Sequence, residues 1–534
     1  MPQLKKTDIK TVEFPEQDES SGEITVGLLG PNCMDPEAIA ALDVMNMYLA
    51  GSSVSVLEKE LVEIKEPWAS SVQIYTDERP DTVLWFQLTS VETEKLEAAE
   101  KKLFEVLKKT ASNPLNLEYM RQLLRRQKRQ KIFFTESSES LFSRLIITDH
   151  LFGTRDGKQL IETTATVDAY DALEKWTEPE WRAFLNKWYV DRHHVSVLGR
   201  PSAAMAKRLE EDDKTRVEKR VKDLGEAGLK KLQEKLDAAK AENDREIPAE
   251  VIGQFKVPSV DSIPFIKTTT ARGGLAKKAE GPGRESSGVE VTPAQNIIDR
   301  DNVDLPLYLH FESVPTKFVH LSLYVSTASI PVKLRPLVPI YFENFFNSPV
   351  MKDGVRIEYE NVVEKLEEDT VAFSIEDAGP VDLSEEIRIR FQIEPEKYEA
   401  AIAWIKTLLW DVIFDTKRIE VFVAKIRSDI PDEKREGNSM SASVTKMIQL
   451  APESIGRAKD TLVKSKYMKR IDALLKEDPK EVIRQLEEFR DAFARLENFH
   501  ILVIADLNVL KNPVSAWKSF VAGKPFVRNA SKFY

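Results

Sequence analysis

An internal repeat constrains the fold of this 534-residue chain more than any other feature of its sequence. The segment ETEKLEAAEKKLFEVL begins at Glu92, and a related segment, EPEKYEAAIAWIKTLL, begins at Glu394. Both contain the pattern E-x-E-K-x-E-A-A, and in both the apolar residues recur every three to four positions, which is the spacing of one helical face. The two segments are therefore predicted to be equivalent amphipathic helices in two homologous modules.

The flanks of these helices repeat in the same order. An alternating strand (TVLWFQLTS or EIRIRFQIE) precedes each helix, and a closing strand (HHVSVLGR or FHILVIADL) ends each module. Each module also opens with a strand, EITVGLLGP or FVHLSLYVS, that leads into an apolar helix. The order strand, helix, strand pair, helices and closing strand predicts an α+β fold, in which helices cover one side of an antiparallel or mixed sheet.

The repeat divides the chain into six predicted regions. They are an N-terminal tail (1–19), a first α+β module (20–200), a charged helical hairpin linker (201–250), an irregular Gly/Ser-rich connector (251–300), a second α+β module (301–511) and a C-terminal tail (512–534). The connector includes ARGGLAKKAEGPGRESSG, which we expect to be mobile because of its glycine and serine content.

The linker contains two charged helical arms that meet at GEAG, residues 225–228. Leu229, Leu232 and Leu236 are spaced three and four residues apart, which predicts a narrow apolar seam between the arms. A solvated spacer is the alternative, because helices with many charges usually face water.

Charge and cysteine content exclude several classes of protein. The 77 Lys and Arg residues against 88 Asp and Glu residues give a net charge of −11, which argues against nucleic acid as a partner. Cys33 is the only cysteine, so no intrachain disulfide can form, as is typical of a reducing compartment.

No apolar run reaches the ~18 residues of a membrane span. The amino end has no signal-peptide core, so we expect a cytoplasmic protein; a true N-terminus upstream of Met1 would leave a mitochondrial location open.

The segment MRQLLRRQKRQK, residues 120–131, concentrates six basic side chains on one predicted helix. Such a cluster is found in nucleic-acid or targeting patches. The same helix has Leu123 and Leu124 for a core-facing side, and the chain as a whole is acidic. We therefore interpret the segment as an ordinary surface helix of the first module.

Zinc-binding motifs are absent from the sequence. No two of the six histidines lie four residues apart with a glutamate between them, so neither H-E-x-x-H nor H-x-x-E-H occurs. The segment DRHHV places Asp191 and His193 on one face of a predicted strand, and these are the candidate metal ligands. No third ligand is visible, so an ordinary strand edge is the alternative. An intact enzyme that uses this pair is a third, separate hypothesis for the function.

Several phrases of the chain resemble one known family. LAGSSVSVLEKELVE, RPDTVLWFQLTSVETEKLEAAE, LEKWTEPEWRAFLNKW and HHVSVLGRPS, together with the duplicated module and the charged linker, are similar to the pitrilysin/insulinase (inverzincin) family of zinc metallopeptidases. The similarity is greatest to fungal cytosolic members related to the presequence protease. The resemblance implies two mitochondrial-processing-peptidase-like modules, which correspond to the second and third of the four modules that enclose a chamber in that family.

In that family the first module carries H-x-x-E-H, whose histidines bind zinc and whose glutamate is the general base. If the helix that opens the second module here takes the place of the zinc helix, H-x-x-E-H falls on IYFEN, residues 340–344. Ile340 and Asn344 then fill the two histidine positions, and Glu343 is left as a vestigial catalytic residue. A helix-edge glutamate without such ancestry is the alternative. The resemblance thus implies no cofactor in this chain, with zinc held by the family's catalytic module.

Two hypotheses about function follow from the resemblance. In the first, the chain is a non-catalytic portion of a zinc metalloendopeptidase that degrades short unfolded peptides; it lines the chamber, is inactive alone, and binds complementary peptidase modules or itself. In the second, it is a freestanding peptidase-like scaffold or interaction protein without hydrolytic activity. The sequence identifies no substrate-binding residues for either hypothesis.

Overall fold

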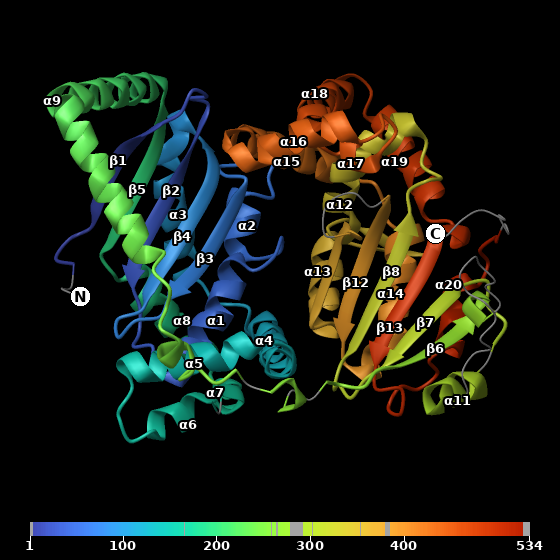
Figure 1. The fold of residues 1–534 in the computed structure, drawn as a ribbon. Coiled ribbons are helices and arrows are strands. Elements are labelled where there is room, and N and C mark those ends of the chain that lie inside the picture. Colours follow the sequence, from blue (N-terminus) through green and yellow to red (C-terminus); the bar gives the residue numbers. More distant parts are fainter. Residues whose placement is uncertain are drawn as a thin grey trace. The chain divides into compact units, whose positions relative to one another are not determined.

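The computed structural model describes residues 4–164, 166–257, 259–262, 265–277, 292–301, 303–352, 354–379 and 385–526. Two β-sheets, one in each predicted module, are each covered by helices on one side (Figure 1). Both sheets belong to one compact unit, and a second unit consists of Glu13–Glu19 and Arg200–Lys267. The predicted α+β class is confirmed.

The first sheet has five strands in the order β1-β5-β2-β4-β3. These strands are β1 (Asp8–Pro15), β2 (Ser21–Leu29), β3 (Ser71–Asp77), β4 (Val83–Glu92) and β5 (His194–Ser202). The helices of this module are α1 (Pro36–Ala50), α2 (Val56–Leu61), α3 (Leu96–Ala111), α4 (Leu117–Ser137), α5 (Glu139–Phe152), α6 (Lys158–Thr164), α7 (Thr166–Leu173) and α8 (Glu178–Leu185), with the short turns η1 (Thr93–Lys95) and η2 (Asn186–Val190). Alternate residues of β2, namely Ile24, Val26 and Leu28, face the helices and form the core.

The second sheet has six strands in the order β11-β12-β8-β13-β7-β6. These strands are β6 (Thr269–Gly274), β7 (Tyr308–Ser313), β8 (Val319–Ser326), β11 (Ala372–Asp377), β12 (Glu386–Ile393) and β13 (Phe499–Ala505), beside a separate ribbon of β9 (Val350–Lys352) and β10 (Val355–Ile357). The helical segments of this module are α11 (Pro293–Arg300), η5 (Val332–Leu337), α12 (Val338–Phe346), α13 (Tyr359–Asp369), η6 (Pro395–Lys397), α14 (Tyr398–Trp410), α15 (Thr416–Arg435), α16 (Gly437–Gln449), α17 (Ile455–Ala458), α18 (Thr461–Glu477), α19 (Pro479–Phe493), η7 (Leu496–Asn498), η8 (Ser515–Trp517) and α20 (Lys518–Val521).

The two modules repeat one another in topology. Read from one edge, the first sheet is β3-β4-β2-β5-β1 and the second begins β11-β12-β8-β13-β7, so each strand of the first sheet has a counterpart in the same place, and β6 extends the second sheet by one strand. The helices follow the same order: α1 and α12 come after the central strand, and α3, α4 and α5 correspond to α14, α15 and α16. The repeated E-x-E-K motif forms the turn that leads into α3 and into α14 in the two copies.

The modules extend beyond their predicted boundaries. β1 joins the first sheet from within the predicted N-terminal tail, and β6 and α11 lie in the predicted irregular connector. In the predicted C-terminal tail, the side chains of Trp517 and Phe520 are fully buried in the second core. The sequence phrases that revealed the repeat do not include these elements, which become ordered because they pack on a surface formed by distant residues. Residues 278–288 of the Gly/Ser-rich segment lie outside the described residues.

The linker forms α9 (Ala203–Asn243), which bends sharply at Gly225. This glycine has φ of 57° and ψ of −175°, a combination that only glycine adopts readily. The two arms diverge from the bend (Figure 1), and Leu229, Leu232 and Leu236 are 41%, 42% and 49% exposed. The predicted apolar seam is therefore wrong, because the leucines share one side of the helix but remain exposed to solvent.

Within their compact unit, the two modules contact each other through buried ion pairs. Arg126 of α4 lies 2.7 Å from Glu367 of α13, and Arg418 of α15 lies 2.7 Å from Glu63. All four side chains are at least about 90% buried. Arg129 also donates to the backbone oxygens of residues 367, 368 and 370. Part of the basic segment 120–131 thus binds the second module, in place of the simple surface helix that we predicted.

Candidate functional site

The first candidate site is the helix that carries Glu343. This helix, α12, follows the central strand of the second sheet as α1 follows the central strand of the first. Ile340 and Asn344, which the hypothesis of a vestigial motif assigns to the two histidine positions, are fully buried in the second module. The side chain of Glu343 points the other way and is 30% exposed.

Glu343 is engaged by a lysine from another helix. Lys425 Nζ of α15 lies 3.1 Å from Glu343 Oε2. The first module contains a counterpart, because Asp43 of α1 lies 3.2 Å from Lys131 Nζ of α4. α1 corresponds to α12 and α4 to α15, so an acid–lysine pair joins the same two helices in both copies of the repeat.

The electrostatics around Lys425 favour its charged ammonium form. Burial disfavours the charged ammonium, but Glu343, Glu63 and Glu58 outweigh that effect and hold the pKa of Lys425 above its ordinary value. Burial is also the main reason why the pKa of Glu58, on α2 of the first module, is raised to about 7. The Glu343 carboxylate therefore has a permanent cation beside it at neutral pH.

The residues at the family motif do not fit zinc. A catalytic zinc site takes about three protein ligands, usually imidazoles or carboxylates. Ile340 offers no donor atom, and the Asn344 amide lies in the core, where its Oδ1 accepts a hydrogen bond from Ser348. The ammonium of Lys425 would repel a dication at the remaining carboxylate.

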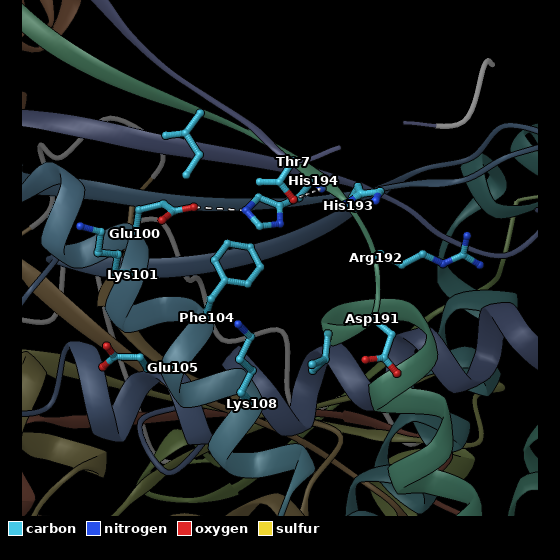
Figure 2. Close-up of a pocket in the computed structure, with 12 residues that line it drawn as sticks. Thr7, Glu100, Lys101, Phe104, Glu105, Lys108, Asp191, Arg192, His193 and His194 are labelled. Atoms are coloured by element: carbon cyan, nitrogen blue, oxygen red, sulfur yellow. Dashed lines mark hydrogen bonds and ion pairs between the residues drawn. The ribbon is translucent and has the colours of Figure 1, made fainter. Parts of the chain in front are cut away.

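The second candidate site contains Asp191 and His193, beside a cavity of about 560 Å³ (Figure 2). The cavity is lined by α3, by the start of the chain and by Val190–His194. Asp191 follows η2, and its backbone N–H donates to Asn186 O at 2.8 Å, whereas β5 begins only at His194. The predicted strand face is therefore wrong for Asp191 and His193, and Figure 2 shows the two side chains apart.

The polar contacts in this cavity centre on His194, which lies beside the predicted ligands Asp191 and His193. His194 Nε2 lies 3.2 Å from Glu100 Oε1, and Ser196 Oγ donates to the same oxygen at 2.8 Å. The ring of Phe104 stacks on the imidazole with a centroid distance of 3.8 Å. Burial alone would raise the pKa of Glu100, but the hydrogen bonds from His194 and Ser196 lower it. The alternation of His194 and Ser196 along β5 was the available signal, but it does not reveal that Glu100 lies opposite.

The described part of the chain brings together no metal-binding cluster. Among these residues, no group of three or more His, Cys, Asp or Glu side chains is arranged to hold a metal ion. His194 and Ser196 both contact the same Glu100 oxygen, so this carboxylate fixes the position of the two side chains. In the same part of the chain, no helix combines the length and the apolar character needed to cross a membrane.

Comparison with known proteins supports the resemblance to peptidases. Residues 2–126 match the family model described as Peptidase M16 inactive domain. M16 peptidases are the pitrilysin/insulinase type, so the predicted resemblance is confirmed by this match, which lies in the first module. The description of this domain as inactive agrees with a non-catalytic, peptidase-like scaffold.

Relatives from other organisms match nearly the whole chain. The uncharacterized protein YOL098C of Saccharomyces cerevisiae is 28% identical over 529 residues, which are 97% of this chain and 50% of that protein. An uncharacterized protein of Schizosaccharomyces pombe is 26% identical over 524 residues, which cover 96% of this chain and 49% of the relative. The chain thus spans about half the length of these relatives.

Solved peptidase structures are also similar to this chain. The crystal structure of pitrilysin matches 97% of this chain and 49% of its own, with 9% identity and a TM-score of 0.43. A mutant of the ferredoxin protease FusC, in complex with Arabidopsis ferredoxin, matches 98% of this chain and 52% of its own, with 10% identity and a TM-score of 0.42.

Proposed function

We propose that this chain, whose residues 2–126 match the family model described as Peptidase M16 inactive domain, is a non-catalytic wall of a cytosolic chamber that degrades short unfolded peptides. The observation that carries the proposal is the acid–lysine pair at the opening helix of both modules. Each module keeps the helix on which the family's catalytic motif lies, but a lysine neutralises the helix's acid. Neither module then offers a base or a metal ligand there.

The contacts of the Glu343 and Asp43 carboxylates explain why we do not expect this chain to hydrolyse peptides by itself. A zinc peptidase needs a carboxylate that accepts a proton from metal-bound water. Glu343 instead forms an ion pair with Lys425, and Asp43 forms one with Lys131 and also accepts a hydrogen bond from Tyr170 Oη at 3.2 Å. Zinc and its base would be supplied by another peptidase module, and this chain would contribute peptide-binding surface.

A peptide-binding assay and a cleavage assay test the proposal together. We expect the purified chain to bind a fluorescein-labelled unfolded peptide in an anisotropy titration, and to bind a folded protein of similar charge more weakly. We expect no cleavage of a quenched fluorogenic peptide, with or without added zinc. The variant Glu343→Gln should leave both results unchanged, because Glu343 has no catalytic role in the proposal.

Two outcomes would contradict the proposal in different ways. Peptide cleavage that a chelator abolishes would reveal a metal site in this chain, and Asp191, His193 and His194 would be the first residues to replace. Absence of both binding and cleavage would favour the freestanding scaffold, which shares the inactive modules but has no peptide ligand.

A further inference from the structure

The cavity between α3 and the segment Val190–His194 is lined by a pair of rings that are fixed in place. The imidazole of His194 stacks on the ring of Phe104 with a centroid distance of 3.8 Å, and its Nε2 lies 3.2 Å from Glu100 Oε1 (Figure 2). Ile9 and Val190 add apolar surface to the same cavity. An apolar surface that does not have to reorganise favours the binding of an apolar or aromatic group.

The charged side chains that line the cavity are balanced in sign. Apart from the two histidines, they are three cations and three carboxylates: Lys101, Lys108, Arg192, Glu100, Glu105 and Asp191. A lining without net charge selects neither an anion nor a cation, but it suits a ligand that carries one charge of each sign.

Two of these charged side chains are available to a ligand. Lys108 lies one turn after Phe104 on α3, and Asp191 lies between η2 and β5. Neither side chain forms an ion pair or a hydrogen bond with another residue that the structure describes, and Figure 2 shows the two apart. Arg192, by contrast, donates from Nε to Lys187 O at 3.1 Å.

We propose that this cavity binds a short peptide of two or three residues through both of its free termini. At pH 7 both termini are charged, so the carboxylate pairs with Lys108 and the ammonium with Asp191, while an apolar side chain packs on the Phe104–His194 stack. The volume of about 560 Å³ is that of an ordinary ligand pocket.

The separation of Lys108 and Asp191 favours a short peptide over a single amino acid. The two charges of an amino acid flank one carbon atom, whereas each further residue moves them about 3.5 Å apart in an extended chain. Short peptides with free ends are the class of compound that degradation of an unfolded peptide leaves. The inference thus goes beyond the proposed function, because the cavity takes a product of degradation and not the substrate.

Calorimetric titration of the 534-residue chain tests the role of each terminus. The ligands are the dipeptide Ala-Phe, its N-acetylated form, which has no ammonium, and its C-terminal amide, which has no carboxylate. We expect Ala-Phe to bind about tenfold more tightly than either blocked form, since each block removes one charge-assisted hydrogen bond.

Two variants assign the termini to their partners. In Lys108→Gln, Ala-Phe and its amide should bind equally, while the preference over the acetylated form is kept. In Asp191→Asn, Ala-Phe and the acetylated form should bind equally, while the preference over the amide is kept. A variant that merely disturbs the fold would weaken all three ligands together. The control variants Lys175→Gln and Asp212→Asn, at exposed positions outside the cavity, should keep both preferences.

Three outcomes would overturn the proposal. They are no binding of Ala-Phe by the wild type, equal binding of the free and the blocked dipeptides, and preferences that persist in Lys108→Gln and Asp191→Asn. A long unfolded peptide that is acetylated and amidated reports on the proposed function separately. Its failure to bind would contradict the proposed function and leave the dipeptide preferences unchanged.

Discussion

Replacement of Arg126 by methionine removes the cation from a buried ion pair that joins α4 to α13. The Arg126 and Glu367 side chains are 10% and 4% exposed, and they lie 2.7 Å apart. The variant leaves the Glu367 carboxylate with the Tyr119 hydroxyl, which donates to it at 3.1 Å, but without a positive charge. The charge would then be buried between two modules with only a neutral partner.

The expected cost follows from this burial. Removal of one partner of a buried ion pair destabilises a protein by about 3–5 kcal/mol, because the other charge stays desolvated. Replacement of both partners by apolar residues is often close to neutral. We therefore expect Arg126→Met and Glu367→Leu each to lower the free energy of unfolding by about 3–5 kcal/mol. We expect the triple variant, which combines both changes with Tyr119→Phe, to recover most of that loss.

Urea unfolding measures these differences from the shift in midpoint at constant slope. Arg125→Met is the matched control, because Arg125 is the next residue of α4, is 51% exposed and lies 3.9 Å from Glu174. Exposed pairs contribute about 0–1 kcal/mol, so this control should stay close to the wild type. A change below about 1 kcal/mol for Arg126→Met, or a combined variant as unstable as the two single variants added together, would refute the reasoning.

Three further predictions concern other parts of the chain. Burial raises the pKa of Glu58 from 4.5 to about 7, so the folded chain holds this proton more tightly and loses stability as pH rises through that range. Between pH 5 and pH 8, the free energy of unfolding of the wild type, measured from urea midpoints, should fall by roughly 1–3 kcal/mol relative to that of Glu58→Gln. The control variant Glu97→Gln should match the wild type. Trp517→Ala should lower the free energy of unfolding by about 3–5 kcal/mol, since the side chain is fully buried, and an unchanged melting temperature would show that the C-terminal segment does not pack on the second core. Gly225→Ala should favour a straighter α9, because alanine avoids φ of 57° with ψ of −175°; a longer distance between spin labels on the two arms would confirm this, and an unchanged distance would contradict it.

Much of the fold could be read from local spacing alone. The periods of 3.6 and 2 residues in the segments from Glu92 and Glu394, and in the strands before them, depend only on which side of one element faces a core. Because that information lies within about ten residues, the sequence revealed the repeat and the α+β class.

The candidate sites depended on contacts that local spacing does not contain. Lys425 lies 82 residues from Glu343 in the chain, and Arg126 lies 241 residues from Glu367, so only the packing of α15 on α12 and of α4 on α13 brings these charges together. The same limit explains the errors: the leucine spacing of α9 identified an apolar side but not whether another surface covers it. A pattern determines which side of an element is apolar, whereas the tertiary structure decides what meets that side, because the partner comes from a distant part of the chain.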